Sequence, residues 1–230
     1  MKATYLELEM AMARIMARQQ ASGFQLDLSA ATRVQAHLSH RFEQLKEGMQ
    51  RRFFGIPGKM KCPKRPNKTK GQHKGCPYTE VLAFNPTSRV HIAHALKGLG
   101  VHLDKTTTSG QIQIDEDILQ EIVENTTYSV PARKAARRFA RLLKIQKWLG
   151  QLSQGANAWL KTVESDGCIH HSCRLATQTG RNAHSSPNLG QVVSAPWARK
   201  LFIPHDGHIL VGCDLAALEL RCLGHFIHPF

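Results

Sequence analysis

The chain has 230 residues, of which 42% are hydrophobic, so it can bury a core and we do not expect bulk disorder. Its 31 Lys and Arg residues outnumber the 17 Asp and Glu residues, and the net charge of +14 predicts a polyanionic partner. No apolar run reaches the roughly 18 residues of a membrane span, and the first residues lack the apolar centre of a signal peptide. We therefore expect no membrane segment, a cytoplasmic location and six reduced thiols.

The positive charge is concentrated in two segments that contain no acidic residue. Residues 51–76 hold nine Lys and Arg residues, and residues 125–163 hold eight. The rest of the chain carries a net charge of −3. A single basic run is usually a solvated face, but two acid-free runs in one chain favour a surface that binds nucleic acid.

In chain order, the sequence first predicts two helices and a loop. The first helix runs from residue 5 to residue 20 and stops at Gly23. The second begins near Asp27 or Ser29. Its apolar side chains recur at helical spacing, at Val34, Leu38, Phe42, Leu45 and Met49. Residues 55–77 are too rich in Gly and Pro for a helix and predict a flexible basic loop.

Three more helices are predicted before residue 165. The turn at residues 84–88 leads into a short helix that ends near Gly98, and Asp115 caps the next helix. A long helix over residues 131–149 begins with Pro131. Its basic side chains recur every three or four residues and therefore share one face: Lys134, Arg137, Arg138, Arg141 and Lys144.

The character of the sequence changes near residue 165. Residues 168–172 predict a strand after a turn, and a polar stretch rich in Gly, Ser and Asn follows. Residues 208–213 predict a short buried strand that ends at Asp214, with a helix over residues 215–226. By position alone, Asp214 is expected to be the N-cap of that helix.

Several motifs together resemble family A of the DNA polymerases, the Pol I superfamily. Residues 214–221, Asp-Leu-Ala-Ala-Leu-Glu-Leu-Arg, match motif A of that family, D-x-x-x-x-E-L-R. A T-G-R segment at 179–181 and a P-N-L segment at 187–189 precede it in the family's order, and Arg199 and Phe202 match an R-x-x-F pair. Further matches are the G-F-Q-L-D turn at 23–27 and the F-N-P-T-S turn at 84–88. Residues 158–160 and 219–226 are most similar to the phage replicative branch.

The resemblance implies an α+β fold with two parts. Residues 1–165 form a mostly helical thumb that grips DNA through its backbone, with the basic loop at 55–77. Residues 166–230 form the beginning of an antiparallel palm sheet, with the T-G-R segment and motif A. The implied function is the extension of a primer on a DNA template during DNA replication. The reaction is nucleotidyl transfer with two metal ions, so the implied partners are primer–template DNA and a deoxynucleoside triphosphate (dNTP).

The resemblance also implies roles for particular residues. Asp214 is the catalytic carboxylate and a Mg²⁺ ligand, and the carbonyl oxygen of Leu215 is a second ligand. The matching Glu in the family lies beside the nucleotide sugar, so this role is implied for Glu219. Five residues place Glu219 about 140° around a helix from Asp214, so it is not expected to share the metal. Arg181 reaches the duplex near the primer terminus, and Asn188 and Gln191 contact template or primer. The five basic residues of the 131–149 helix contact the DNA backbone.

Other family motifs do not occur in these 230 residues. The fingers helix that binds the triphosphate and the H-D-E turn with the second metal-binding Asp have no match. We therefore expect these residues to be part of a polymerase that holds one carboxylate of the two-metal site. We expect this part to be inactive without a separate chain that carries the fingers and the rest of the palm. The alternatives are a non-catalytic module that binds duplex or primer–template DNA, and a truncated remnant. In each case the last helix is expected to expose an apolar patch.

Two Cys and His clusters offer zinc sites as alternatives. Cys62, His73 and Cys76 fit no common zinc spacing and have no evident fourth ligand, so a plain loop is favoured. Residues 168–173 alternate between the two faces of the predicted strand, which argues against one shared ion. The basic loop is short, so direct DNA contact is a simpler interpretation than recruitment of a processivity factor.

Overall fold

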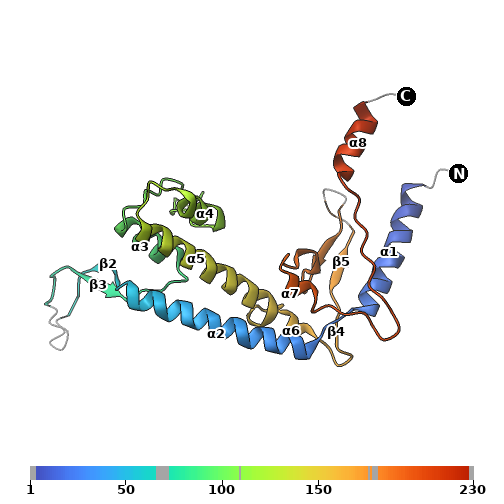
Figure 1. Ribbon diagram of the computed structural model, residues 1–230, viewed down its shortest axis with the longest axis horizontal. Helices are drawn as coiled ribbons and strands as arrows, with labels where there is room; N and C mark the ends of the chain where they lie inside the picture. The colour runs from blue at the N-terminus through green and yellow to red at the C-terminus, as the bar shows by residue number, and fades with distance from the viewer. Residues whose placement is uncertain (1–3, 66–72, 109, 176, 178–180, 228–230) are drawn as a thin grey trace. The chain divides into compact units, whose positions relative to one another are not determined.

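The computed structural model describes residues 4–65, 73–108, 110–175, 177 and 181–227. The chain divides into two compact units, one of residues 29–161 and one of residues 1–28 with 162–230. Figure 1 shows an α+β chain in which helices predominate. Three small antiparallel sheets of two strands each occur among the described residues. None of the helices in these ranges is long and apolar enough to cross a membrane.

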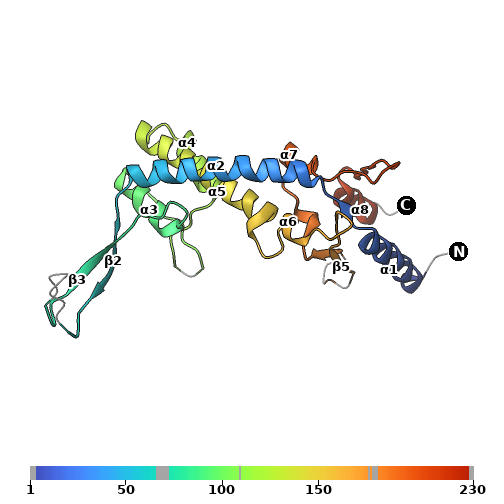
Figure 2. The ribbon, with the colours of Figure 1, turned by 90° about the horizontal axis from the view of Figure 1, so that it is seen from below.

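The unit of residues 29–161 is built mainly from helices. It contains α2 (Leu28–Arg52) from its second residue, β2 (Ile56–Lys61), β3 (Tyr78–Leu82), α3 (Arg89–Gly98), α4 (Glu116–Glu124), α5 (Val130–Leu149), the π-helical turn η2 (Gly150–Gln154) and α6 (Trp159–Thr162) up to its third residue. The hairpin of β2 and β3 extends away from the helices of the same unit in both ribbon views (Figure 2).

Polar caps place the starts of α4 and α5 where the sequence predicts them. The carboxylate of Asp115 accepts the backbone N–H of Ile118 at 2.9 Å. The hydroxyl of Ser129 accepts the backbone N–H of Ala132 at 3.3 Å, and Pro131 lies in the first turn of α5. Each cap satisfies a donor that the helix itself leaves unpaired.

The core of this unit lies where α3 and α4 pack against α5. Phe139 of α5 is fully buried, and its ring centroid lies 5.6 Å from that of Phe53 and 6.2 Å from that of Phe84. Small residues of α5 bring the helices close together: Ala132, Ala135 and Ala136. The predicted apolar stripe of α2 contributes Met49 to the same cluster.

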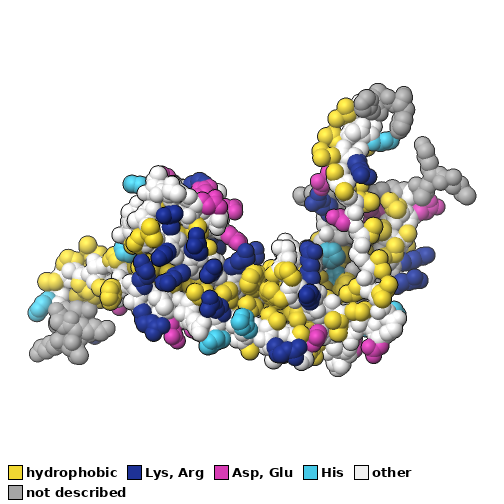
Figure 3. Space-filling model, in the orientation of Figure 1, with side chains coloured by type: hydrophobic (Ala, Val, Ile, Leu, Met, Phe, Trp, Pro, Cys, Tyr) yellow, Lys and Arg dark blue, Asp and Glu magenta, His cyan; other side chains and the backbone are white. Residues whose placement is uncertain are grey.

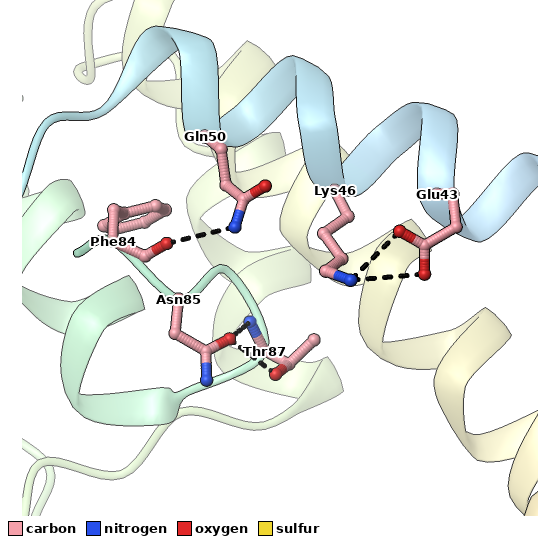
Figure 4. A network of polar contacts seen from close by, with 6 residues as sticks. All are labelled: Glu43, Lys46, Gln50, Phe84, Asn85 and Thr87. Carbon is pink, nitrogen blue, oxygen red and sulfur yellow. Dashed lines mark hydrogen bonds and ion pairs between the residues drawn. The ribbon is translucent and has the colours of Figure 1, made fainter.

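The predicted turn at residues 84–88 lies between β3 and α3 and is hydrogen-bonded to α2 (Figure 4). The side chain of Gln50 donates to the carbonyl of Phe84 at 3.5 Å. The side-chain oxygen of Asn85 accepts the backbone N–H of Thr87 at 3.0 Å and its hydroxyl at 2.8 Å. These local bonds make an Asx turn, which confirms the prediction for this segment.

The prediction of a loop throughout residues 55–77 is wrong for residues 56–61. These residues form β2, which pairs antiparallel with β3. Gly55 is needed because the strands approach closely there: a Cβ atom on it would lie 2.6 Å from the carbonyl oxygen of Leu82. Glycine therefore allows close packing of two strands here. The Gly and Pro content of a segment does not distinguish this role of glycine from its role in turns.

The second unit contains the remaining elements. They are α1 (Tyr5–Ser22), β1 (Phe24–Gln25), β4 (Cys168–Ile169), β5 (Ser172–Arg174), β6 (Ala183–Ser185), the 3₁₀ turn η3 (Leu189–Gln191), α7 (Pro196–Arg199) and α8 (Leu218–Ile227). Gly23 ends α1 as predicted, with φ at +64°, in the region that favours glycine. The single predicted strand at 168–172 is instead two strands separated by His170 and His171.

The predicted buried strand at residues 208–213 is wrong. These residues are exposed and form no strand; Ile209 is 82% exposed and Val211 is 81% exposed. A strand is stable only where another strand takes up its hydrogen bonds, and no described residue pairs with this segment.

The final helix begins later than predicted and exposes its apolar side chains. It starts at Leu218 rather than at Leu215. The predicted exposed apolar patch is confirmed for residues in and just before α8: Leu215, Leu218, Leu220, Leu223 and Phe226.

Replacing Phe139 with Ala should destabilise the unit of residues 29–161 by about 3–5 kcal/mol, because it leaves a cavity at the centre of the core. Hydrogen exchange of α4 and α5 amides in increasing urea measures this loss. The exposed neighbour Arg138 provides a matched control, and Arg138→Ala should change stability by no more than about 0.5 kcal/mol. Equal effects of the two changes would contradict the assigned core.

Candidate functional site

Segments that are far apart in the sequence meet by backbone pairing in the second unit. The N–H of Asp27 donates to the carbonyl of Leu201 at 2.8 Å, and the N–H of Ile203 donates to the carbonyl of Gln25 at 3.0 Å. Leu26 forms an isolated antiparallel bridge with Phe202. The motif at residues 23–27 is thus joined to the R-x-x-F segment at 199–202.

An apolar pocket lies beside this junction. Its lining comes from several motif segments and includes Phe24, Leu189, Val192, Arg199, Phe202 and Leu210. The pocket therefore brings together the G-F-Q-L-D turn, the P-N-L segment and the R-x-x-F pair. Sequence comparison with a motif shows the order of such segments, but their contact is a property of the fold.

The turn before β4 is held by His170. Its Nδ1 lies 2.8 Å from the carbonyl oxygen of Gln20, and its Nε2 lies 2.9 Å from a carboxylate oxygen of Asp166. Both partners accept hydrogen bonds, so they favour the doubly protonated ring and raise the pKa of His170. The bond from the N–H of Cys168, followed by the one from His170, lowers the pKa of Asp166.

His171, the next residue, has the opposite kind of environment, because its ring is buried. It is only 2% exposed, and neither of its ring nitrogens has a hydrogen-bond partner among the described residues. Its ring lies 5.6 Å from that of Phe24 and 5.0 Å from that of His184. Burial, and secondarily the nearby His184, lowers the pKa of His171. Sequence reasoning did not single out His171 or His184 individually, because a His in a polar stretch carries no signal of burial.

Arg181 and Glu219, two predicted site residues, form an ion pair with each other. Their side chains are 75% and 78% exposed. An exposed ion pair contributes little stability, so either partner can exchange it for another charged group. Thr179 and Gly180, which complete the T-G-R segment, lie outside the described residues.

The P-N-L segment presents polar groups to solvent. Asn188 is exposed and caps η3, where its side chain accepts the N–H of Gly190 at 3.1 Å. Gln191 is also exposed, at the end of the same turn. Both predicted contact residues are therefore accessible to a ligand.

Asp214 is exposed and lies in a segment without regular structure. It does not cap α8, which begins four residues later, so the predicted N-cap and the helical angle to Glu219 are wrong. No group of three or more His, Cys, Asp or Glu side chains in the described ranges is placed to hold a metal ion. Among the described residues, neither Asp214 nor the set of Cys62, His73 and Cys76 belongs to such a group.

The predicted basic stripe is confirmed on α5 in the other unit. Its five Lys and Arg residues are exposed, while Phe139 and Leu142 on the opposite side are buried. Figure 3 shows Lys and Arg side chains gathered over the helices of this unit. Sequence reasoning did not predict that Lys144 pairs with Glu116 of α4, at 3.1 Å. That pair reduces the free charge at one end of the stripe.

Comparison with known proteins gives matches over most of the chain. Residues 67–228 match the sequence profile described as DNA polymerase family A. DNA-directed DNA polymerases of Escherichia phage T7 and Enterobacteria phage T3 are each 36% identical over 173 residues, which is 68% of this chain and 24% of the relative. The chain spans about a quarter of the length of these curated relatives.

A solved structure supports the same fold. The POL domain of Pol1 from M. smegmatis, in complex with DNA primer-template and dNTP, has a TM-score of 0.55 and 18% sequence identity. The similarity covers 85% of this chain and 29% of that one.

His170 and His171 should titrate in opposite directions from the ordinary histidine value near 6.5. The raised pKa of His170 contributes stability that is present below about pH 6.5 and is lost as pH rises through its folded pKa. The lowered pKa of His171 contributes stability that is present above about pH 6.5 and is lost as pH falls. NMR titration of the ring carbons, assigned with His170→Gln and His171→Phe variants, should give midpoints on opposite sides of 6.5; midpoints on the same side would contradict the two environments.

Proposed function

Because the chain belongs to family A of the DNA polymerases, we propose that it holds primer–template DNA and contributes one catalytic carboxylate to template-directed DNA synthesis. The observation that carries this proposal is the exposed basic stripe of α5. A rigid helix whose opposite face is fixed in a core keeps its charges in a constant row, and such a row suits the regular spacing of phosphates.

The stripe supports binding that is independent of base sequence. Lys134, Arg137, Arg138 and Arg141 are exposed, and no carboxylate partner is recorded for them in the described part of the chain. Each contact between such a cation and a phosphate releases counterions, which provides affinity without reading bases. We include the exposed basic loop residues Lys64, Arg65 and Lys74 as further phosphate contacts.

The second unit would place polar groups near the primer end. We assign Arg181 to the duplex near the primer terminus and Asn188 and Gln191 to template or primer, since all three are exposed. Glu219 is assigned to the sugar of the incoming dNTP. The exposed Arg181–Glu219 pair must then separate or rearrange when DNA and nucleotide bind, which costs little because the pair is solvated.

Asp214 would serve as one hard oxygen ligand of Mg²⁺, with the carbonyl of Leu215 beside it. A two-metal site needs further carboxylate oxygens, and the described residues contain no group of three or more His, Cys, Asp or Glu side chains that could hold a metal ion. We therefore expect nucleotidyl transfer to require a second metal-binding Asp and the fingers, supplied outside these 230 residues or by another chain. A second candidate is a non-catalytic module that holds primer–template DNA, because the described residues assemble no group of three or more metal-binding side chains.

The stripe can be tested through the salt dependence of binding to a DNA duplex. Each lost phosphate contact lowers the slope of log Kd against log salt by about 0.9, so Arg137→Gln with Arg141→Gln should lower it by about 1.8. Fluorescence anisotropy over a range of salt concentrations measures the slope. A matched control replaces Lys46 and Lys105, which pair with Glu43 and Glu121, by Gln. The stripe has no role in DNA binding if both double variants keep the original slope.

Primer extension distinguishes the two candidates. The 230-residue chain alone should bind primed template in Mg²⁺ and dNTP but add no nucleotide. A second polypeptide that supplies the fingers and the other metal-binding Asp of a family A polymerase should restore extension. Asp214→Ala should then reduce it about 100-fold or more, because a lost metal ligand removes several kcal/mol of transition-state stabilisation. DNA binding without any restored extension would instead favour the non-catalytic module.

A further inference from the structure

A pocket of about 340 Å³ lies where α2 ends and β2 begins, beside the last turn of α3. Three aromatic rings contribute to its lining, those of Phe53, Phe54 and Phe84, together with small and aliphatic residues. Arg52 and His94 are its charged or polar members, and both are exposed. The volume falls in the range of about 300–1,000 Å³ in which proteins hold small organic groups. None of the described residues that line the pocket is acidic.

The side chain of Phe54 is 87% exposed, although the residues on both sides of it are held in the structure. On one side, the ring of Phe53 stacks on that of Phe139 in the core, with centroids 5.6 Å apart. On the other side, Gly55 lies so close to β3 that a Cβ atom on it would be 2.6 Å from the carbonyl oxygen of Leu82. The connection therefore presents an aromatic ring to solvent from a backbone that is fixed at both ends, which lowers the entropic cost of binding.

Positive charge accompanies this exposed ring. The guanidinium of Arg52, in the last turn of α2, lies 5.9 Å from the ring centroid of Phe53. Lys59 is exposed on β2, three residues from Ile56, which is about 10 Å at the rise of a strand. Neither Arg52 nor Lys59 makes an ion pair with a described residue. Cations next to exposed aromatic faces suit an anionic chain that carries flat rings.

Single-stranded DNA has this chemistry and duplex DNA does not. The bases of a single strand are unpaired, so their faces can stack on an aromatic side chain, and every base has such a face. In a duplex the base faces are covered by neighbouring base pairs, and an aromatic side chain reaches them only if a base leaves the stack. No residue of α5 lines the pocket, so it is separate from the basic stripe that we assign to the duplex.

We propose that this pocket binds one unpaired base of single-stranded DNA, which stacks on Phe54 while Arg52 and Lys59 contact the adjacent phosphates. The site accepts any base, because stacking on a ring does not read the hydrogen-bonding edge of the base. The inference rests on the proposed function only in taking DNA as the partner. The base pocket and the α5 stripe use different residues, so each can be refuted without the other.

Fluorescence anisotropy with two labelled oligonucleotides of equal length tests the stack. One is a single strand of thymidine nucleotides, and the other has the same number of phosphates but no bases. The intact 230-residue chain should bind the first with a Kd about tenfold lower. Phe54→Ala should remove that preference, because the base loses its aromatic partner. Phe54→Tyr keeps a ring and should retain the preference to within about twofold.

A matched substitution and a cross-link locate the contact. Phe226 is 83% exposed and lies in the other unit, so Phe226→Ala removes an equally exposed ring and should leave the preference for bases unchanged. A single strand in which 5-iodouracil replaces one base should cross-link to the chain under ultraviolet light. Trypsin should then release the cross-linked strand on residues 53–59, because Arg52 and Lys59 are cleavage sites.

The base pocket is refuted if the Phe54→Ala chain still prefers the strand with bases, or if the cross-link lies only on other peptides. Binding to a blunt duplex reports on the stripe separately. Phe54→Ala should leave the Kd for the duplex unchanged, whereas Arg137→Gln with Arg141→Gln should raise it. If the stripe substitutions leave duplex binding unchanged while Phe54→Ala removes the preference for bases, the stripe is refuted and the base pocket stands.

Discussion

The burial of one side of α5 is the constraint on which the unit of residues 29–161 depends. Phe139 and the small residues Ala132, Ala135 and Ala136 bring α3 and α4 against this helix. Because that side is packed, the basic side must face solvent, and its charges form a row that side-chain motion alone does not disperse. Packing and the proposed DNA contact are therefore two consequences of a single helical periodicity.

The second unit depends instead on backbone pairing between distant segments. Residues 25–27 bond to residues 201–203, and β1 pairs with β4. These bonds bring three motif segments to one apolar pocket, where Phe24, Leu189 and Arg199 meet. Arg181, Asn188 and Gln191 are exposed in the same unit. The pairing thus forms a framework, and the polar groups that we assign to DNA and nucleotide are carried on it.

Much of the fold was predictable because its signals are local. The starts of α4 and α5 follow from Asp115 and Pro131, and the turn at Asn85 follows from its own side chain. The predictions that failed involve partners elsewhere in the chain. Ile56–Lys61 forms a strand because β3 accepts its bonds, and residues 208–213 form none because no described segment does. At the candidate site, the motifs nominate the individual residues, but the Arg181–Glu219 pair could not be predicted from them.

By itself, the sequence determined where the long helices form, which of their faces is apolar or basic, and which family the motifs resemble. These properties depend on side-chain chemistry and spacing within about twenty residues. Only the tertiary structure decided that His170 and His171, adjacent in the chain, have pKa shifts of opposite sign. It also decided that residues 56–61 form a strand, because they pair with β3. The physical reason is that burial and cross-strand pairing depend on atoms contributed by segments that are distant in the sequence.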